Sequence, residues 1–261
     1  MINILAFHVL VFIYELYDKR KLLYRAFCAG SIITQDRVLT STHCFLSNRK
    51  RRIRDFHSIR VVGGILDTLV PYIPFQDIQQ WRTIEKLYSQ RFYRFPAYNL
   101  AILKVNEEWN FNKFVNKIPY TQWNQDFDGV CYGTTVKTTK SWKNNKSLFA
   151  VGFRMIPRKS CELRLLRCCE LYYCTRYDIK SSTSVEIEGG GLICYGTKDP
   201  AERSQGVLVG VTSLINYGLP SLHNRIGLHY QWVTDGCSCI TFNYYLFICL
   251  VMLIAGRTFD L

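Results

Sequence analysis

The chain has 261 residues, of which 48% are hydrophobic and 20% charged, a composition that excludes wholesale disorder and allows a full-sized core. Lys and Arg number 33 against 20 for Asp and Glu, so the formal net charge is +13 and nucleic acid, anionic glycan or a membrane surface could be a partner. Eleven cysteines indicate an oxidising compartment rather than the reduced cytosol.

The first residues do not have the pattern of a secretory signal peptide, because no positive charge precedes the apolar stretch. The segment from His8 to Tyr17 is rich in β-branched and aromatic residues, which favours a buried strand. Our interpretation is that the true N-terminus lies upstream of Met1.

The middle of the chain alternates short apolar runs with turn residues. This spacing predicts an all-β barrel or sandwich rather than βαβ units. Two helices are also expected, one from Ser160 to about Tyr172 and one from about His229 into the apolar tail. The predicted strands include Gly30–Ile33, Arg37–Leu39, Ile59–Val62, Leu100–Val105 and Gly206–Thr212.

The C-terminal region is apolar on every face. No charge occurs between Asp235 and Arg257, a run long enough to span a bilayer as a helix. We predict a single-pass transmembrane helix over 237–256, followed by a short tail over 257–261. A buried terminal helix and the removable tail of a lipid anchor are the alternatives, and the second lacks its usual polar spacer.

The most informative stretch runs from Phe27 to Phe45, where two cysteines bracket two strand-like runs and His43 precedes the second cysteine. Its residue types follow, across nearly twenty positions, the pattern Cys-Gly-Gly-Ser-Ile-Ile … Leu-Thr-Ala-Ala-His-Cys. The stretch closely resembles the histidine box of trypsin-like (chymotrypsin-fold, S1 family) serine proteases. On that resemblance, His43 occupies the position of the general base.

The resemblance continues in the right order along the chain. It implies two antiparallel six-stranded β-barrels with a C-terminal helix, over residues 1–236, and the disulfides Cys28–Cys44, Cys131–Cys194 and Cys161–Cys174. The further matching segments are Tyr98–Val105, Glu186–Cys194, Gly210–Ser213 and Pro220–Val233.

The departures from the family pattern concern its chemistry. The triad needs a serine nucleophile, a histidine base and a carboxylate that orients the histidine. Glu188 stands at the serine position and Asn99 at the carboxylate position. A carboxylate attacks only electrophiles more reactive than an amide, and an Asp-to-Asn exchange in this family costs about 10⁴ in rate.

Two further features of the family are changed. The oxyanion-hole positions carry Glu186 and Glu188, so two carboxylates replace a flexible glycine and the serine. The buried Asp that pairs with the ammonium of an activated N-terminus is Ile187 here. An apolar residue there avoids burying an unpaired carboxylate where no activation tetrapeptide precedes the histidine box.

The positions of the substrate pocket give no cleavage preference. Ser182 falls near the pocket base by spacing and supplies no carboxylate for a basic side chain. Ser213 matches the substrate-aligning strand, but Leu214 and Ile215 follow where the family has Trp-Gly, and Ile215 would narrow the entrance.

The remaining cysteines and cations leave several interpretations open. Cys168, Cys169, Cys237 and Cys239 would pair in an order that the sequence does not give, and their spacing disfavours zinc, so we expect no metal or cofactor. A basic run after the histidine box could be a solvated loop, a docking patch for an anionic surface or acidic protein, or a convertase site. Its cations are Arg49, Lys50, Arg51, Arg52 and Arg54.

The sequence therefore predicts a catalytically inactive serine protease homologue on the extracellular side, secreted or membrane-anchored, that binds a protein or an anionic surface. Nucleic acid is not expected, because no stacking platform or groove-reading motif accompanies the charge. One alternative is an active serine endopeptidase whose nucleophile is Ser181, Ser182 or Ser184. Another is a different hydrolase that uses His43 with Glu188.

Overall fold

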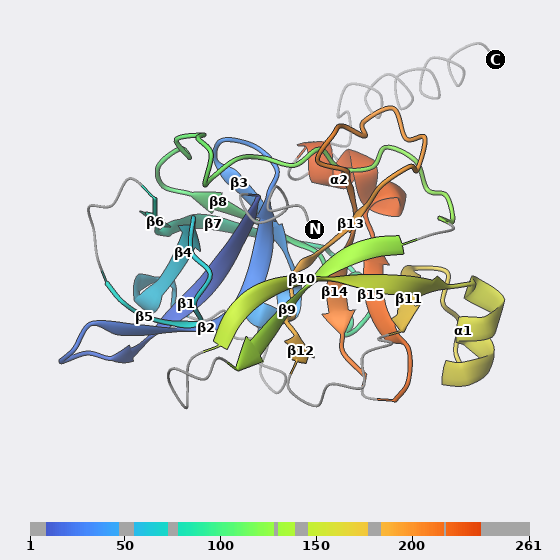
Figure 1. Cartoon of the computed structure of the whole chain (residues 1–261), viewed down its shortest axis with the longest axis horizontal. Coiled ribbons are helices and arrows are strands. Elements are labelled where there is room, and N and C mark those ends of the chain that lie inside the picture. The colour runs from blue at the N-terminus through green and yellow to red at the C-terminus, as the bar shows by residue number, and fades with distance from the viewer. Residues whose placement is uncertain are drawn as a thin grey trace, which may run out of the picture.

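The computed structural model describes residues 9–46, 55–72, 78–127, 130–138, 146–176, 184–216 and 218–235. In this part of the chain the strands form two antiparallel sheets that lie side by side (Figure 1). The predicted all-β, chymotrypsin-like class is confirmed.

The first sheet is a half-barrel made from the N-terminal half of the chain. Its described strands run in the order β6-β4-β1-β2-β3-β8-β7, with β5 on the side of β2. The edge strands β6 and β7 are consecutive along the chain, with only Thr83 between them. The strands are β1 (Leu10–Asp18), β2 (Leu23–Ile32), β3 (Arg37–Thr40), β4 (Ile59–Gly63), β5 (Leu69–Pro71), β6 (Gln80–Arg82), β7 (Ile84–Ser89) and β8 (Ala101–Val105).

The second sheet closes into a six-stranded barrel. Its path β10-β11-β15-β14-β13-β9 returns to its start because β9 also pairs with β10, and β12 is added beside β9. The strands are β9 (Val130–Thr138), β10 (Lys146–Ile156), β11 (Tyr172–Arg176), β12 (Ser184–Glu186), β13 (Gly191–Cys194), β14 (Val207–Leu214) and β15 (Ser221–Arg225).

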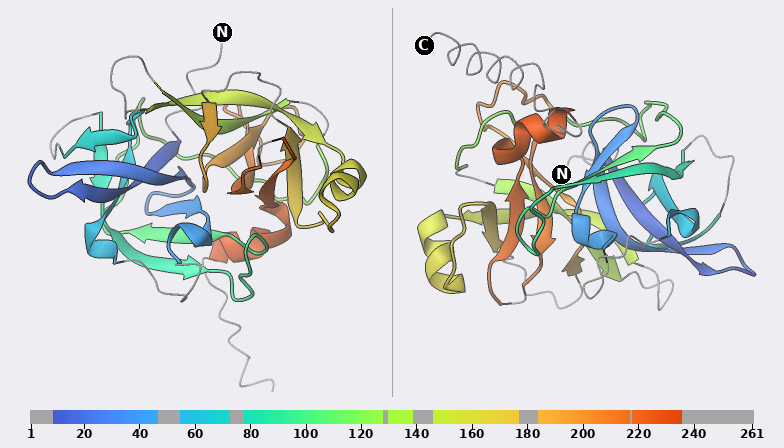
Figure 2. Two further views of the ribbon diagram at one scale, coloured as in Figure 1. Left: turned by 90° about the horizontal axis from the view of Figure 1, so that it is seen from below. Right: turned by 180° about the vertical axis from the view of Figure 1, so that it is seen from behind.

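Helices are short in the described residues. They are α1 (Arg158–Leu165), α2 (Tyr230–Asp235) and the 3-10 turns η2 (Thr42–Cys44), η3 (Phe56–Ser58) and η4 (Gly227–His229). The prediction of a helix to about Tyr172 was too long, because Leu166 adopts a left-handed conformation (φ 51°) that ends α1, and β11 begins at Tyr172. Figures 1 and 2 both place α1 at the outer side of the second barrel.

The predicted membrane helix over 237–256 lies outside the described residues. Among the residues that are described, none of the helices combines the length and the apolar character needed to cross a bilayer.

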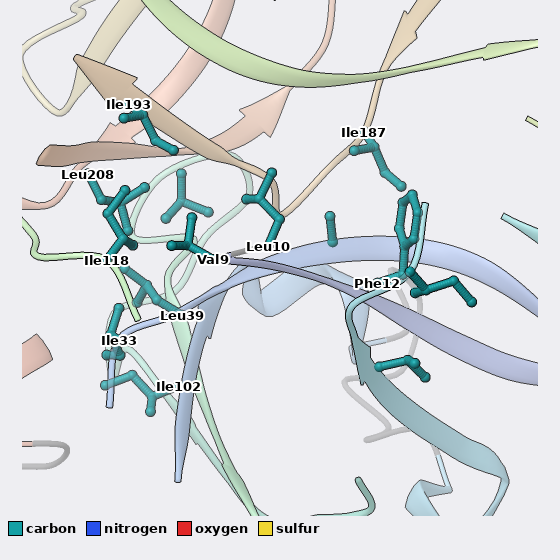
Figure 3. Close-up of a cluster of buried hydrophobic side chains, with 14 of the residues drawn as sticks. Val9, Leu10, Phe12, Ile33, Leu39, Ile102, Ile118, Ile187, Ile193 and Leu208 are labelled. Atoms are coloured by element: carbon teal, nitrogen blue, oxygen red, sulfur yellow. The ribbon is translucent and has the colours of Figure 1, made fainter. Parts of the chain in front are cut away.

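The largest core cluster joins the two sheets. Leu10 and Phe12 of β1 point toward Ile187, Ile193 and Leu208 of the second half of the chain (Figure 3). β1 is buried continuously from Leu10 to Tyr14, which explains its unbroken apolar run. Burying each such side chain contributes about 1.5–3 kcal/mol, so this shared cluster holds the two sheets together.

Three disulfides, all at the positions implied by the family resemblance, link the described elements. Cys28–Cys44 joins β2 to η2, Cys131–Cys194 joins β9 to β13, and Cys161–Cys174 joins α1 to β11. The first of these bridges fixes the turn that carries His43.

Candidate functional site

The side chains predicted at the triad positions meet where the two sheets face each other. His43 lies in η2 directly after β3, and Asn99 precedes β8. Glu188 comes from the turn between β12 and β13 in the second sheet. The side chain of His43 is 11% exposed and that of Glu188 is 39% exposed, so the pair opens to solvent on the glutamate side.

The orientation of the Asn99 amide follows from its neighbours. The backbone N–H of His43 donates to Asn99 Oδ1 at 2.9 Å, which identifies the oxygen. The Ser213 hydroxyl donates to the carbonyl of Pro96 at 3.0 Å, so its oxygen must accept from Asn99 Nδ2, which lies 2.7 Å away. The amide nitrogen therefore has one remaining proton to donate.

That remaining proton determines the tautomer of His43. Asn99 Nδ2 lies 2.7 Å from His43 Nδ1, so this ring nitrogen accepts a hydrogen bond and carries no proton. In the neutral ring the proton is then on Nε2, which donates to Glu188 Oε2 at 2.7 Å. Both ring nitrogens are occupied by these two contacts.

This tautomer is the reverse of the one that serine proteolysis needs. A catalytic histidine donates from Nδ1 to its carboxylate and keeps Nε2 free to take the proton of the nucleophile. Here Nδ1 faces an amide donor and Nε2 faces a carboxylate. The arrangement has the triad's positions with the hydrogen-bond direction inverted at both ends.

The turn that carries Glu188 is fixed through its backbone. The carbonyl of Glu188 accepts from the N–H of Ala29 at 2.9 Å, and the N–H of Gly189 donates to the carbonyl of Thr212 at 2.9 Å. Gly189 has φ +77°, and a Cβ there would lie 2.4 Å from the carbonyl oxygen of Ala29. The turn therefore requires glycine at this position. Glu186 ends β12, in register with Thr135 of β9.

The family model named Trypsin matches residues 11–231 of this chain. The chain belongs to the trypsin family. Two similar curated proteins are Trypsin-1 and Trypsin-10 of Gadus morhua, each 24% identical over 230 residues that cover 80% of this chain and 80% of the relative.

The residues that the sequence assigns to the substrate pocket lie at the end of β14 and directly after it. Ser213 and Leu214 end β14, with Ser213 fully buried and Leu214 and Ile215 half-buried. Ser213 is engaged by Asn99 and Pro96, so its hydroxyl belongs to the network around His43. Ser182 lies outside the described residues, as does the basic run Arg49, Lys50, Arg51, Arg52 and Arg54.

A buried histidine behind the pocket strand was not predicted. His223 of β15 lies between the hydroxyls of Thr175 (2.8 Å to Nε2) and Thr212 (3.1 Å to Nδ1). Complete burial lowers its pKa to about 3, so the ring is neutral at ordinary pH. Thr212 also accepts through its carbonyl from the Ser41 hydroxyl at 2.8 Å, which couples this layer to the turn before His43.

Aromatic residues of the segment before Asn99 also reach the site. The ring of Phe95 packs edge-on against His43, with centroids 5.4 Å apart. Burial, together with the negative charge of Glu188, raises the pKa of Tyr93. The sequence signal for these contacts is only their nearness to Asn99 along the chain.

Two groups of potential metal ligands occur among the described residues. They are Cys28, His43 and Cys44, and Cys161, Cys169 and Cys174. In each group, two of the three residues are cysteines that are bonded to each other, so their sulfur atoms are not free thiolates. Neither group fits a structural zinc site, which needs four free ligands.

Proposed function

We propose that this trypsin-family chain is a non-catalytic homologue that acts by binding. The observation that carries the proposal is the hydrogen bond between His43 Nε2 and Glu188 Oε2 at 2.7 Å. It places an acceptor carboxylate where the family's reaction requires a hydroxyl that gives up its proton.

The carboxylate of Glu188 is a poor nucleophile toward a peptide bond. Attack would form an acid anhydride, which is more reactive than the amide it came from, and carboxylate nucleophiles serve on more activated electrophiles. The negative charge would also oppose the oxyanion that the family stabilises at this point. Proteolysis therefore lacks both its nucleophile and its charge stabilisation.

His43 is also poorly placed as a base for any other hydrolysis. A general base needs an unprotonated nitrogen within hydrogen-bond reach of the substrate or a water. Nδ1 is taken by the amide of Asn99, and Nε2 carries the proton that Glu188 accepts. This geometry disfavours a hydrolase that would use His43 with Glu188.

The binding role would be exercised on the extracellular side, by a secreted or membrane-anchored chain, toward a protein or an anionic surface. The three disulfides support an oxidising compartment. The described residues also include a strongly basic hairpin tip between β1 and β2, where Lys19, Arg20 and Lys21 are exposed. This tip supports attraction of an acidic partner.

A labelling assay tests the proposal. The purified chain, its His43→Ala variant and an active trypsin are exposed to a fluorophosphonate probe and a panel of peptide substrates. We expect no labelling and no turnover by the chain. Labelling of the chain that His43→Ala abolishes would overturn the proposal and point to an unrecognised serine nucleophile.

A second variant tests whether the missing serine hydroxyl alone accounts for the expected lack of turnover. Glu188→Ser restores the family's nucleophile but leaves Asn99, Ile187 and Glu186. We expect no measurable turnover from Glu188→Ser alone, because Asn99 still donates to Nδ1. Substantial activity in this variant would mean that the tautomer of His43 is not set by Asn99.

A further inference from the structure

A free thiol lies against a disulfide at the outer side of the second barrel. The sulfur atoms of Cys161, Cys169 and Cys174 all lie within 4.8 Å of one another, and all three residues are buried. Cys161 and Cys174 are bonded, whereas Cys169 is a free cysteine. Thiol–disulfide exchange needs this juxtaposition of a thiol with a disulfide sulfur.

We propose that Cys169 exchanges with the Cys161–Cys174 bridge and thereby releases helix α1. The Cys169 thiolate attacks Cys174 Sγ, a Cys169–Cys174 bond forms, and Cys161 leaves as a thiolate that takes up a proton. One S–S bond breaks and one forms, so no external oxidant or reductant is consumed.

The choice of Cys174 as the attacked sulfur follows from what each leaving thiol can do. Attack on Cys161 would free Cys174, which is held within β11 between β10 and β15 and would remain beside the new bond. Attack on Cys174 frees Cys161, which lies on a helix at the periphery of the molecule (Figures 1 and 2). A thiol that can move away does not reverse the exchange as readily.

Helix α1 depends on this bridge for its attachment. Cys161 is the one fully buried residue of α1, all of which the structure describes, and the half-buried Leu165 adds a smaller contact with the same cluster. On its outer side Leu163 is 77% exposed. Glu162 accepts from the N–H of Cys169 at 3.1 Å, which ties the helix to the loop that carries the thiol. Loss of the Cys161 bond therefore removes the main anchor of α1.

The environment of Cys169 sets when exchange occurs. Burial raises the pKa of its thiol, with the carboxylate of Glu162 from α1 acting in the same direction and Arg167 of the loop opposing it. Tyr172 of β11 also faces the cluster, and its pKa is raised to about 12, so it stays neutral. The reactive thiolate is therefore scarce at neutral pH and grows as pH rises.

Disulfide mapping in the full-length chain tests the proposal. The Cys168→Ser variant removes the exposed neighbouring thiol. It is incubated without added thiol at pH 7 and pH 9, quenched with acid, alkylated with N-ethylmaleimide and digested after Arg and Glu. Cleavage after Arg167 and Glu170 separates the three cysteines into different peptides.

We expect a Cys169–Cys174 peptide pair with alkylated Cys161, formed faster at pH 9 by about tenfold per pH unit below the thiol's pKa. The control, Cys168→Ser with Cys169→Ser, should retain only Cys161–Cys174. Alkylation confined to Cys169 at both pH values, with Cys161–Cys174 intact, would overturn the proposal.

A trapped variant gives a second readout. Cys161→Ser in the Cys168→Ser background leaves Cys169 and Cys174 as the local pair, and added oxidised glutathione supplies the oxidant that their pairing needs. We expect a Cys169–Cys174 bridge, an unchanged β-sheet circular dichroism spectrum and faster amide hydrogen exchange in 158–165 than in the Cys168→Ser parent. A folded variant in which both cysteines are alkylated, or in which exchange in 158–165 is unchanged, would contradict the proposal.

Discussion

The two sides of the site have diverged to different degrees. On the first sheet, the turn after β3 keeps the family's histidine and the Cys28–Cys44 bridge that closes it. On the second sheet, the turn keeps Gly189 and Gly190, but the three positions before them carry glutamate, isoleucine and glutamate, and the first of these replaces a glycine of the family. The disulfide on the first side and the glycines on the second are residues that hold the backbone of each turn in place.

The contrast between Gly189 and Glu188 shows why. A side chain at Gly189 would collide with the carbonyl of Ala29 and the hydroxyl of Thr40, because its Cβ would lie 2.4 Å from each of these oxygens. The side chain of Glu188 instead is 39% exposed and contacts His43 through its carboxylate. We therefore expect position 188 to tolerate exchange better than Gly189.

The largest effect that we expect concerns the buried His223, which lies between the hydroxyls of Thr175 and Thr212. Burial holds the pKa of His223 near 3, below the unfolded value of about 6.5, so the unfolded chain binds more protons between these values. The contribution of His223 to the free energy of unfolding is therefore fully present above pH 6.5. It falls on acidification, by on the order of 4 kcal/mol at pH 3. Urea unfolding of the chain and of His223→Gln from pH 7 to pH 3 measures the difference, which should shrink as pH falls.

Ile187→Asp should have the next largest effect on stability. It restores the family's residue but buries a carboxylate in an apolar cluster that holds Leu10 and Phe12. We expect a loss of about 3 kcal/mol at pH 7 in the free energy of unfolding. The loss should be smaller at pH 4, because burial raises the pKa of the new carboxyl and protonation removes its charge. Ile187→Val, with a loss of about 1 kcal/mol and no such pH dependence, is the control.

Gly189→Ala tests the backbone requirement of the turn. We expect a loss of about 2 kcal/mol or more, since the new methyl meets backbone oxygen and φ is +77°. Gly196→Ala is a matched control, because Gly196 has φ +70° but nothing within 4 Å of the added carbon. It should lose only about 1 kcal/mol. Equal losses in urea unfolding would show that packing around Gly189 contributes nothing.

The strand segments could be predicted from the sequence because apolar runs and turn residues are local signals. The three disulfides and the meeting of His43, Asn99 and Glu188 join distant segments, and the family resemblance implies them. The end of α1 was missed, since the left-handed Leu166 has no glycine to signal it. The layer of Thr175, Thr212 and His223 was missed because strand pairing brings these residues together from distant segments.

Glu188→Gln should have the smallest effect. The amide oxygen of glutamine can still accept from His43 Nε2, and the glutamate it replaces is 39% exposed, so solvent already screens its charge. We expect a change of under about 0.5 kcal/mol in urea unfolding. A loss several times larger would mean that the fold depends on the ionic character of this contact.

The direction of the hydrogen bonds at His43 is the central claim, and nitrogen-15 NMR of the histidine ring tests it most directly. With His43→Gln used to assign the signals, we predict that the neutral form of the ring carries its proton on Nε2 and leaves Nδ1 bare. A ring with the proton on Nδ1 and an unprotonated Nε2 would contradict the account, because that tautomer is the one a working triad uses.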